Sequence, residues 1–278
     1  MVVAVASGKG GTGKTTVAVS LALSVTRAQL VDADAEEPNA HLFLSPGIRE
    51  TVPVAMAVPE VHLQSCTFCG RCAAFCRFNA LAVVKEQVLV FPELCHGCGG
   101  CIHACPEGAI ERAERRIGEV EVGEARGRRF IQGRLRPGAP SAVRIVREEM
   151  THLDRDVPAI IDAPPGTACA VQEVMAAADF CLLVTEPTPF GLHDLRMAID
   201  LAAQLEILAA VVINRSGRWD SPIEDECRRR GVPVLLKIPF ERQIAEAYSR
   251  GEALTDAFPE YSDKLRRVYA EIESGVRA

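Results

Sequence analysis

The sequence predicts an α/β protein with a doubly wound, mainly parallel sheet and a smaller α+β unit inserted into it. Three observations support this fold class. Short apolar runs alternate with helical segments along most of the 278 residues, which is typical of a parallel sheet covered on both faces. The first apolar run ends in a glycine-rich turn. Two similar cysteine-rich segments then interrupt the alternation.

The expected elements follow in chain order. A buried strand covers Val2–Ser7, a helix follows from Lys14, and a second strand ends near Asp32. Residues 47–59 are expected to be a proline-containing connector, and residues 117–136 a hairpin. The later elements are helix 141–153, strand 158–163, helix 168–178, strand 180–186, helix 191–206, strand 209–214, helix 221–230, strand 232–239, helix 241–250 and helix 260–275.

Composition excludes several classes of protein. The hydrophobic content of 48% favours a globular chain over a disordered one. The net charge of −6 is unfavourable for binding nucleic acid. No apolar run approaches the roughly 18 residues that cross a bilayer, and the first residues lack the basic region of a secretory signal. We therefore expect a cytoplasmic protein with no membrane span.

Two surface features have more than one interpretation. Five arginines between residues 126 and 136 favour a solvated face over a docking patch for an acidic partner. The last helix places Tyr261, Leu265, Val268 and Ile272 on one face. This pattern favours packing against the core over a membrane anchor.

The glycine-rich turn has the pattern G-x-x-x-x-G-K-[ST] between a strand and a helix. Glycines let successive backbone N–H groups turn inward and form an anion site at the helix N-terminus. Lys14 is expected to reach the β- and γ-phosphates of a nucleotide, and the Thr15 hydroxyl to bind Mg²⁺. The candidate nucleotide-binding residues here are Gly8, Gly10, Gly11, Thr12, Gly13, Lys14, Thr15 and Thr16.

The stretch GKGGTGKT carries an additional lysine, Lys9. It resembles the deviant Walker A motif of the MinD/Mrp/ParA group, which includes the nitrogenase iron protein. The resemblance implies that two chains sandwich the nucleotides, as a homodimer or as a heterodimer with a related ATPase. It also implies that Lys9 reaches the partner's phosphates, so that hydrolysis of ATP to ADP depends on dimerisation.

Three further segments resemble the same family. DADAEEPN resembles its D-x-D segment, which implies Asp32 near Mg²⁺ and Asp34 orienting the attacking water. IIDAPPGT resembles its Walker B and switch II segment, which implies Asp162 as a Mg²⁺ ligand and Gly166 as a sensor of the γ-phosphate. The family's catalytic set is therefore expected at Lys9, Lys14, Asp34 and Asp162. Ordinary strand-terminating aspartates are the alternative for Asp34 and Asp162.

The segment VVINRSG resembles the family's base-reading loop, which implies that Asn214 contacts adenine. A guanine reader would need an acidic residue at position 217, where this chain has glycine. ATP is therefore the expected nucleotide.

Eight cysteines form two copies of C-x₂-C-x₂-C-x₃-C, offset by 29 residues. This spacing predicts two [4Fe–4S] clusters, whereas zinc sites usually pair cysteines across a longer gap. In two-cluster bacterial ferredoxins the fourth cysteine of each run ligates the other cluster. That resemblance assigns the first cluster to Cys66, Cys69, Cys72 and Cys105, and the second to Cys95, Cys98, Cys101 and Cys76.

Other residues near the cysteine runs are assigned more ordinary roles. Arg77 stands where ferredoxins have a proline after the fourth cysteine, which affects the local loop and potential. His96 and His103 are expected to be solvated or packed. The three remaining cysteines are expected to be small buried hydrophobic residues: Cys169, Cys181 and Cys227.

Together these features predict a discontinuous ATPase domain, residues 1–59 and 114–278, with a ferredoxin-like insertion at residues 60–113. The leading hypothesis is an ATPase that couples nucleotide binding to electron transfer with a redox partner protein. An Mrp-like carrier of a metal cofactor is one alternative, although its usual C-terminal C-x-x-C is missing here. A positioning ATPase of the MinD/ParA type is another.

Overall fold

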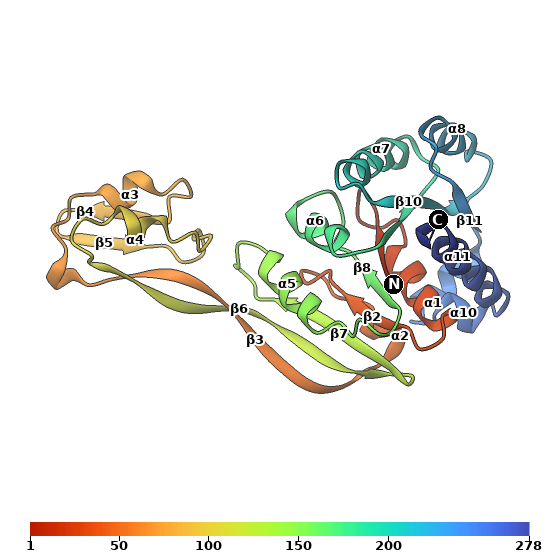
Figure 1. The fold of residues 1–278 in the computed structure, drawn as a ribbon, viewed down its shortest axis with the longest axis horizontal. Helices are drawn as coiled ribbons and strands as arrows, with labels where there is room; N and C mark the ends of the chain where they lie inside the picture. The colour runs from red at the N-terminus through yellow and green to blue at the C-terminus, as the bar shows by residue number, and fades with distance from the viewer. Residues whose placement is uncertain (278) are drawn as a thin grey trace.

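The computed structural model describes residues 1–277 and contains a nine-stranded sheet in the order β11-β10-β9-β1-β8-β2-β7-β6-β3 (Figure 1). The strands from β11 to β7 are parallel, whereas β6 is antiparallel to both β7 and β3. The expected mainly parallel α/β sheet is confirmed. The strands are β1 (Val2–Ala6), β2 (Gln29–Asp32), β3 (Gly47–Val61), β6 (Ile110–Ala125), β7 (Arg128–Leu135), β8 (Ala159–Asp162), β9 (Phe180–Thr185), β10 (Leu208–Ser216) and β11 (Val234–Pro239).

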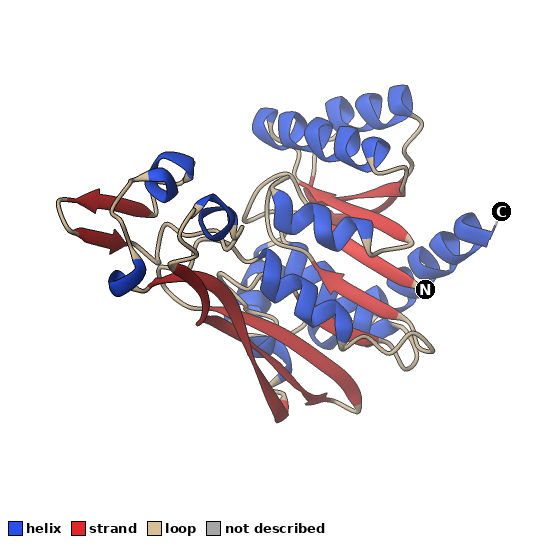
Figure 2. Ribbon diagram, turned by 60° about the vertical axis from the view of Figure 1, so that its left-hand side comes forward, coloured by secondary structure: helices blue, strands red, loops and turns tan. Residues whose placement is uncertain are grey.

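Helices cover both faces of this sheet, as expected of a doubly wound fold (Figure 2). One apolar core lies between the sheet and α1, α10 and α11, and the other lies between the sheet and α5, α6, α7 and α8. The helices are α1 (Lys14–Ser24), α2 (His41–Leu44), α5 (Val143–Thr151), α6 (Cys169–Ala176), α7 (Pro189–Gln204), α8 (Ser221–Arg230), α9 (Arg242–Ser249), α10 (Leu254–Ala257) and α11 (Glu260–Arg277).

Helix α11 packs its apolar stripe against the core. Tyr261, Leu265, Val268 and Ile272 are all buried, so the expected core-packing role is confirmed. In the part of the chain that the structure describes, no helix combines the length and the hydropathy needed to cross a bilayer.

The arginines after residue 126 make contacts within the chain. Arg128 donates to the backbone oxygens of Ala22 and Leu23 near the end of α1. Arg126 pairs with Asp256 at 2.6 Å, and Arg134 pairs with Glu121. Arg126 and Arg128 therefore tie the β6–β7 hairpin to α10 and α1, and Arg134 joins the two strands of the hairpin. Arg136 is exposed, and the choice between a solvated face and a docking patch stays a prediction.

The connector expected at residues 47–59 is wrong, because these residues belong to strand β3. Strand β3 pairs with β6 along its whole length, from Gly47–Glu124 to Val61–Ile110. Its prolines are tolerated because β3 is the last strand of the sheet, where a backbone N–H is not needed on the outer side. The expected hairpin at Arg126–Gly127 is confirmed by the pairing of β6 with β7.

Beyond β7, strands β3 and β6 continue as a two-stranded ribbon that carries a small unit at its end (Figure 1). We call residues 62–109 the cysteine module. It contains η1 (Leu63–Ser65), α3 (Arg71–Phe75), β4 (Leu81–Val84), β5 (Gln87–Val90) and α4 (Gly100–Ala104), with β4 and β5 forming a separate antiparallel sheet. Its small core contains Cys72, Leu81, Cys101 and Ile110.

Candidate nucleotide site and cysteine cavities

The glycine-rich loop connects the buried central strand β1 to the first turn of α1. Gly11 and Gly13 have φ values of 77° and 91°, the left-handed region that favours glycine. A Cβ on Gly8 would lie 2.2 Å from the backbone oxygen of Asp194, so a larger residue has no room there. These restraints hold the loop in a turned conformation at a helix N-terminus, which suits an anion such as phosphate.

Two predicted site residues, Asn214 and Gly166, form hydrogen bonds with backbone oxygens in and next to this loop. Asn214 Nδ2 donates to the backbone oxygen of Thr12 at 2.8 Å, and Gly166 N donates to the backbone oxygen of Ser7 at 3.0 Å. Asn214 therefore supports the loop in this structure, and its contact with adenine stays a prediction. Gly166 has a φ of 89°, and its bond to Ser7 links the 163–168 segment to the loop.

Asp32 and Asp162 lie side by side at the ends of the parallel strands β2 and β8. Both are buried, and burial is the main cause of their raised pKa values, about 8 for Asp32 and about 6 for Asp162. Asp162 also raises the pKa of Asp32, whereas nearby Lys14 lowers that of Asp162. The two carboxylates are thus placed where a bound cation would relieve their mutual repulsion.

The two aspartates differ in their partners. Asp32 Oδ2 accepts hydrogen bonds from the N–H groups of Asn39 and Ala40, each at 2.8 Å. Neither carboxylate oxygen of Asp162 has a geometrically good hydrogen bond within the described residues. A buried acceptor of this kind, close to the Thr15 and Lys14 side chains, fits the oxygen ligands that Mg²⁺ prefers. Asp32 also holds the loop that follows β2, and its role near Mg²⁺ stays a prediction.

Asp34 lies on the loop after β2, close to the ammonium group of Lys14. Its burial raises its pKa, and Lys14 lowers it. The structure thus brings Asp32, Asp34, Asp162 and Lys14 together, as the sequence predicted for a nucleotide site.

Lys9 has a partner that the sequence did not predict. Its Nζ lies 2.5 Å from Glu186 Oε1, and Arg215 Nη1 lies 2.8 Å from Glu186 Oε2. Glu186 directly follows β9, so its signal in the sequence was an acidic residue at the carboxyl end of a strand. In this single chain, Glu186 therefore holds the Lys9 side chain within the same chain. Contact between Lys9 and the phosphates of a nucleotide in a partner chain stays a prediction.

Glu149 is a second residue that was not predicted from the sequence. It is fully buried on α5, and burial raises its pKa well above the ordinary value, with Asp32 and Asp34 adding to the effect. Glu149 follows Ile145 by four residues and Val146 by three, so the helical spacing places it on the apolar face of α5, unlike Glu148.

We expect the stabilising effect of Mg²⁺ with ADP to increase with pH. The raised pKa values of Asp32 and Asp162 mean that the folded chain binds more protons than the unfolded chain between about pH 4 and pH 8. The nucleotide-free protein should lose stability as the pH rises through this range. Bound Mg²⁺ favours the ionised carboxylates, so its stabilisation should be larger at about pH 8 than at about pH 6.

Melting temperatures with and without Mg²⁺ and ADP, measured at both pH values, test this expectation. Asp162→Asn should reduce the stabilisation at both pH values, because it removes a proposed Mg²⁺ ligand, and should reduce its pH dependence, because Asp162 is one of the charges that raise the pKa of Asp32. An equal or smaller stabilisation at the higher pH would contradict it.

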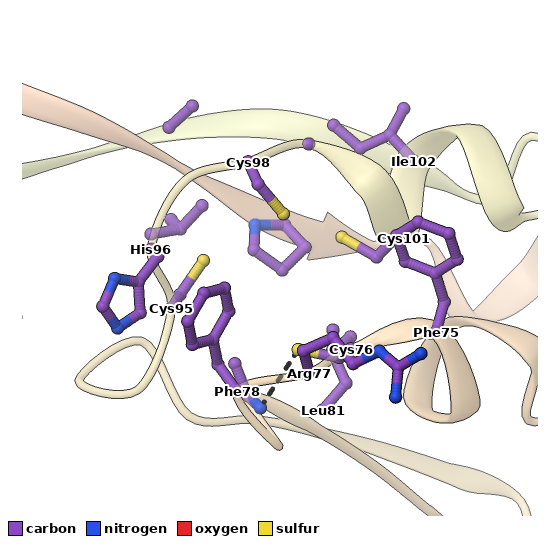
Figure 3. Close-up of a pocket in the computed structure, with 15 residues that line it drawn as sticks. Phe75, Cys76, Arg77, Phe78, Leu81, Cys95, His96, Cys98, Cys101 and Ile102 are labelled. Carbon is purple, nitrogen blue, oxygen red and sulfur yellow. Dashed lines mark hydrogen bonds between the residues drawn. The ribbon is translucent and has the colours of Figure 1, made fainter.

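The eight clustered cysteines line two cavities in the cysteine module. The Cys98 cavity is lined by Cys76, Cys95, Cys98 and Cys101, and Figure 3 shows their sulfur atoms around one space. The Cys69 cavity is lined by Cys66, Cys69, Cys72 and Cys105. Each cavity therefore takes three cysteines from one run and the fourth from the other, which is the grouping that the ferredoxin resemblance implied.

The two halves of the module repeat each other in detail. Backbone N–H groups of Phe68 and Gly97 donate to the sulfurs of Cys66 and Cys95, both at 3.4 Å. In the same way Ala80 and Ala109 donate to Cys76 and Cys105, both at 3.3 Å. Each pair of donors is separated by the 29-residue offset. Donors aimed at sulfur stabilise thiolate ligands and tune bound iron.

The described residues contain no group of three or more His, Cys, Asp or Glu side chains close enough to ligate a single metal ion. A [4Fe–4S] cluster is larger than one ion, and its four thiolates stand further apart. The donor set for such a cluster is therefore judged from the two cavities, which supply four sulfurs each. The residues present fit two cubane clusters.

The remaining cysteines and histidines are placed as follows. Cys181 and Cys227 are buried as expected, but Cys169 is exposed, because it begins α6 at the surface beside the 163–168 loop. The expectation for Cys169 is therefore wrong. His96 packs its ring against Phe78 with centroids 3.9 Å apart (Figure 3).

Comparison with protein families decides the identity of the nucleotide fold. Residues 3–254 match the model described as the CobQ/CobB/MinD/ParA nucleotide binding domain. The chain belongs to this family. Its members are P-loop nucleotide-binding proteins, which agrees with the Gly8–Thr15 loop and with the strand order.

Three proteins are similar to this CobQ/CobB/MinD/ParA family member over nearly its whole length. The uncharacterized protein MJ0579 of Methanocaldococcus jannaschii is 31% identical, over 99% of this chain and 97% of its own length. An iron-sulfur cluster carrier protein of the same organism is 22% identical, over 98% of this chain and 84% of its own. The septum site-determining protein MinD of Pyrococcus horikoshii, complexed with Mg-ADP, superposes with a TM-score of 0.58 at 18% identity, covering 100% of this chain and 98% of its own. The structural likeness concerns the nucleotide-binding fold and does not test the cysteine module.

Proposed function

We propose that this family member is a dimerising ATPase whose nucleotide cycle controls electron transfer through two [4Fe–4S] clusters held by the cysteine module. The observation that carries the proposal is that one chain combines a nucleotide site with two four-cysteine cavities. The cavities supply the ligands, and the clusters supply one-electron redox chemistry when bound.

The nucleotide part of the proposal rests on the loop and its acidic neighbours. The backbone N–H groups of the loop bind the phosphates, and Lys14 neutralises charge that develops on the γ-phosphate. Asp162 and Thr15 hold Mg²⁺, while Asp34 orients the attacking water. Solved relatives named MinD with Mg-ADP support a magnesium nucleotide as the ligand.

A second chain completes the site in this proposal. Lys9 would exchange its bond to Glu186 for the phosphates of the partner's nucleotide, so that ATP favours the dimer. Asp32 holds residues 39 and 40 through backbone hydrogen bonds, and Gly166 connects the 163–168 segment to the loop. Loss of the γ-phosphate would release these two segments, as happens in other nucleotide switches.

Redox potentiometry tests the coupling directly. In anaerobically purified protein, a non-hydrolysable ATP analogue with Mg²⁺ should shift the midpoint potential of at least one cluster or change its rate of electron transfer to an acceptor. Lys14→Ala, which removes the phosphate contact and no cysteine, should abolish the shift. Unchanged potentials and rates in the wild-type chain would contradict coupling.

A cluster carrier is the second candidate, favoured by the names of distant relatives that span most of this chain. Cys69 and Cys98 are also exposed, so a bound cluster would be accessible to an acceptor protein. Transfer of labelled iron to an apo-protein that requires ATP hydrolysis would support the carrier. Retention of all iron through many turnovers would support electron transfer.

A further inference from the structure

The internal repeat makes the two cysteine cavities nearly equivalent, and two exposed charges break that equivalence. At the 29-residue offset, Arg77 corresponds to Pro106 and Phe78 corresponds to Glu107. Arg77 lines the Cys98 cavity, whereas Glu107 lines the Cys69 cavity. The scaffold is therefore repeated, but it places a cation beside one set of four sulfurs and an anion beside the other.

The backbone does not offset this difference. Each cavity receives one N–H···S bond of 3.4 Å and one of 3.3 Å from equivalent positions. The helices that carry the buried cysteines Cys72 and Cys101 both begin after a glycine with a left-handed backbone. The Cys69 cavity has one further cation, because the backbone and charge of Arg71, with the Thr67 side chain, lower the pKa of the Cys69 thiol. Glu107 opposes the charge of Arg71 at that cavity, whereas no acidic residue lines the Cys98 cavity beside Arg77 within the described residues.

Reduction adds one negative charge to a cluster, so a nearby cation favours the reduced form and a nearby anion disfavours it. We infer that Arg77 and Glu107 make the Cys98 cavity the site of higher potential and the Cys69 cavity the site of lower potential. This inference rests on the proposed occupation of both cavities by clusters. In protein that holds one electron, the Cys69 site is then oxidised and the Cys98 site is reduced.

The two sites also differ in their distance from the nucleotide domain. The Cys98 cavity is lined by Ala57, Val58 and Pro59, whereas the Cys69 cavity reaches Val61 at the far end of β3. Gly97 packs so closely on Met56 that a Cβ there would lie 2.7 Å from its side chain. Because β3 runs outward from the main sheet, the Cys98 site is the nearer one. Arg77 and Glu107 therefore direct an electron inward, toward the nucleotide domain.

Charge reversal at each position tests the inference in the full-length, anaerobically purified protein. Dithionite titration monitored by electron paramagnetic resonance gives both midpoint potentials. Arg77→Glu should lower the higher midpoint and leave the lower one nearly unchanged, while Glu107→Lys should raise the lower midpoint. Each single variant should therefore bring the two midpoints closer together, and the double variant Arg77→Glu, Glu107→Lys, which exchanges the two charges, should reverse the order of the two sites. Each single change should alter the distribution of one electron between the two sites several-fold. This effect should be smaller at high salt, because both side chains are exposed and their charges are screened.

Matched controls lie in the same module. Lys85→Glu and Glu86→Lys make the same charge changes in the turn between β4 and β5, at residues that line neither cavity. They should shift both midpoints equally and slightly. The inference is overturned if Arg77→Glu lowers the lower midpoint instead, or moves both midpoints together, in protein that holds about eight iron atoms. Protein without iron would overturn the proposed function as well.

Discussion

Replacing Lys14 with alanine is expected to reduce ATP hydrolysis about a hundredfold to a thousandfold, the effect of removing one preorganised charged donor from a transition state. The Lys14 side chain is buried at the start of α1 and lowers the pKa values of Asp34 and Asp162. It is therefore the cation placed closest to the acidic residues of the site. Steady-state release of phosphate in the presence of Mg²⁺ measures the change.

The control for this variant is Lys264→Ala. The Lys264 ammonium lies 4.3 Å from the centre of the Tyr261 ring on α11. Its removal should leave hydrolysis unchanged. Because Lys14 is the cation beside the buried carboxylates of Asp34 and Asp162, its removal should lower the melting temperature without nucleotide, so hydrolysis is measured well below the melting temperature of the variant. Hydrolysis within tenfold of wild type in a folded Lys14→Ala protein would contradict the assigned role.

The second large effect is expected at the cysteines. Cys101→Ser should remove at least half of the bound iron, from about eight atoms per chain to about four or fewer. Cys101 is buried in the wall of the Cys98 cavity, and burial raises the pKa of its thiol. A neutral thiol is a poor ligand, so this site needs the metal to stabilise the thiolate. Iron analysis after anaerobic purification measures the loss.

Cys169→Ser is the matched control, because Cys169 is an exposed cysteine outside the module. It should retain all the iron. Wild-type protein that contains zinc in place of iron, or a Cys101→Ser protein with the full amount of iron, would contradict the cluster assignment.

Much of the fold was predictable because its signals are local. The buried strands β1, β8 and β9 read as short apolar runs, and the intervening helices separate them at regular intervals. The nucleotide loop was predictable for the same reason, since a fixed spacing of glycines and Lys14 encodes its geometry. The grouping of the cysteines was implied by the resemblance of the two repeated runs to those of two-cluster ferredoxins.

Strand β3 was missed because its evidence is not local. Pro53 and Pro59 indicate a break in most contexts, and only the position of β3 at the edge of the sheet makes them acceptable. Glu186 and Glu149 were missed for a related reason. Their partners are distant in the chain, Lys9 for Glu186 and Asp32 for Glu149. The spacing of α5 places Glu149 on its buried face, but it does not show which charged groups that face meets.

The ribbon has a mechanical consequence. Strand β7 stops pairing with β6 at Gly118, and the register of β3 against β6 shifts between Val54 and Ala55, at the same level. Two strands alone are easier to bend than a full sheet, and a bulge concentrates the bend. The free arm of about eight residues is roughly 26 Å long, so a tilt of about 10° at its base would swing the tip by about 5 Å. Under the proposed function, such a swing would change the distance between the cysteine module and an electron donor or acceptor, and with it the rate of electron transfer.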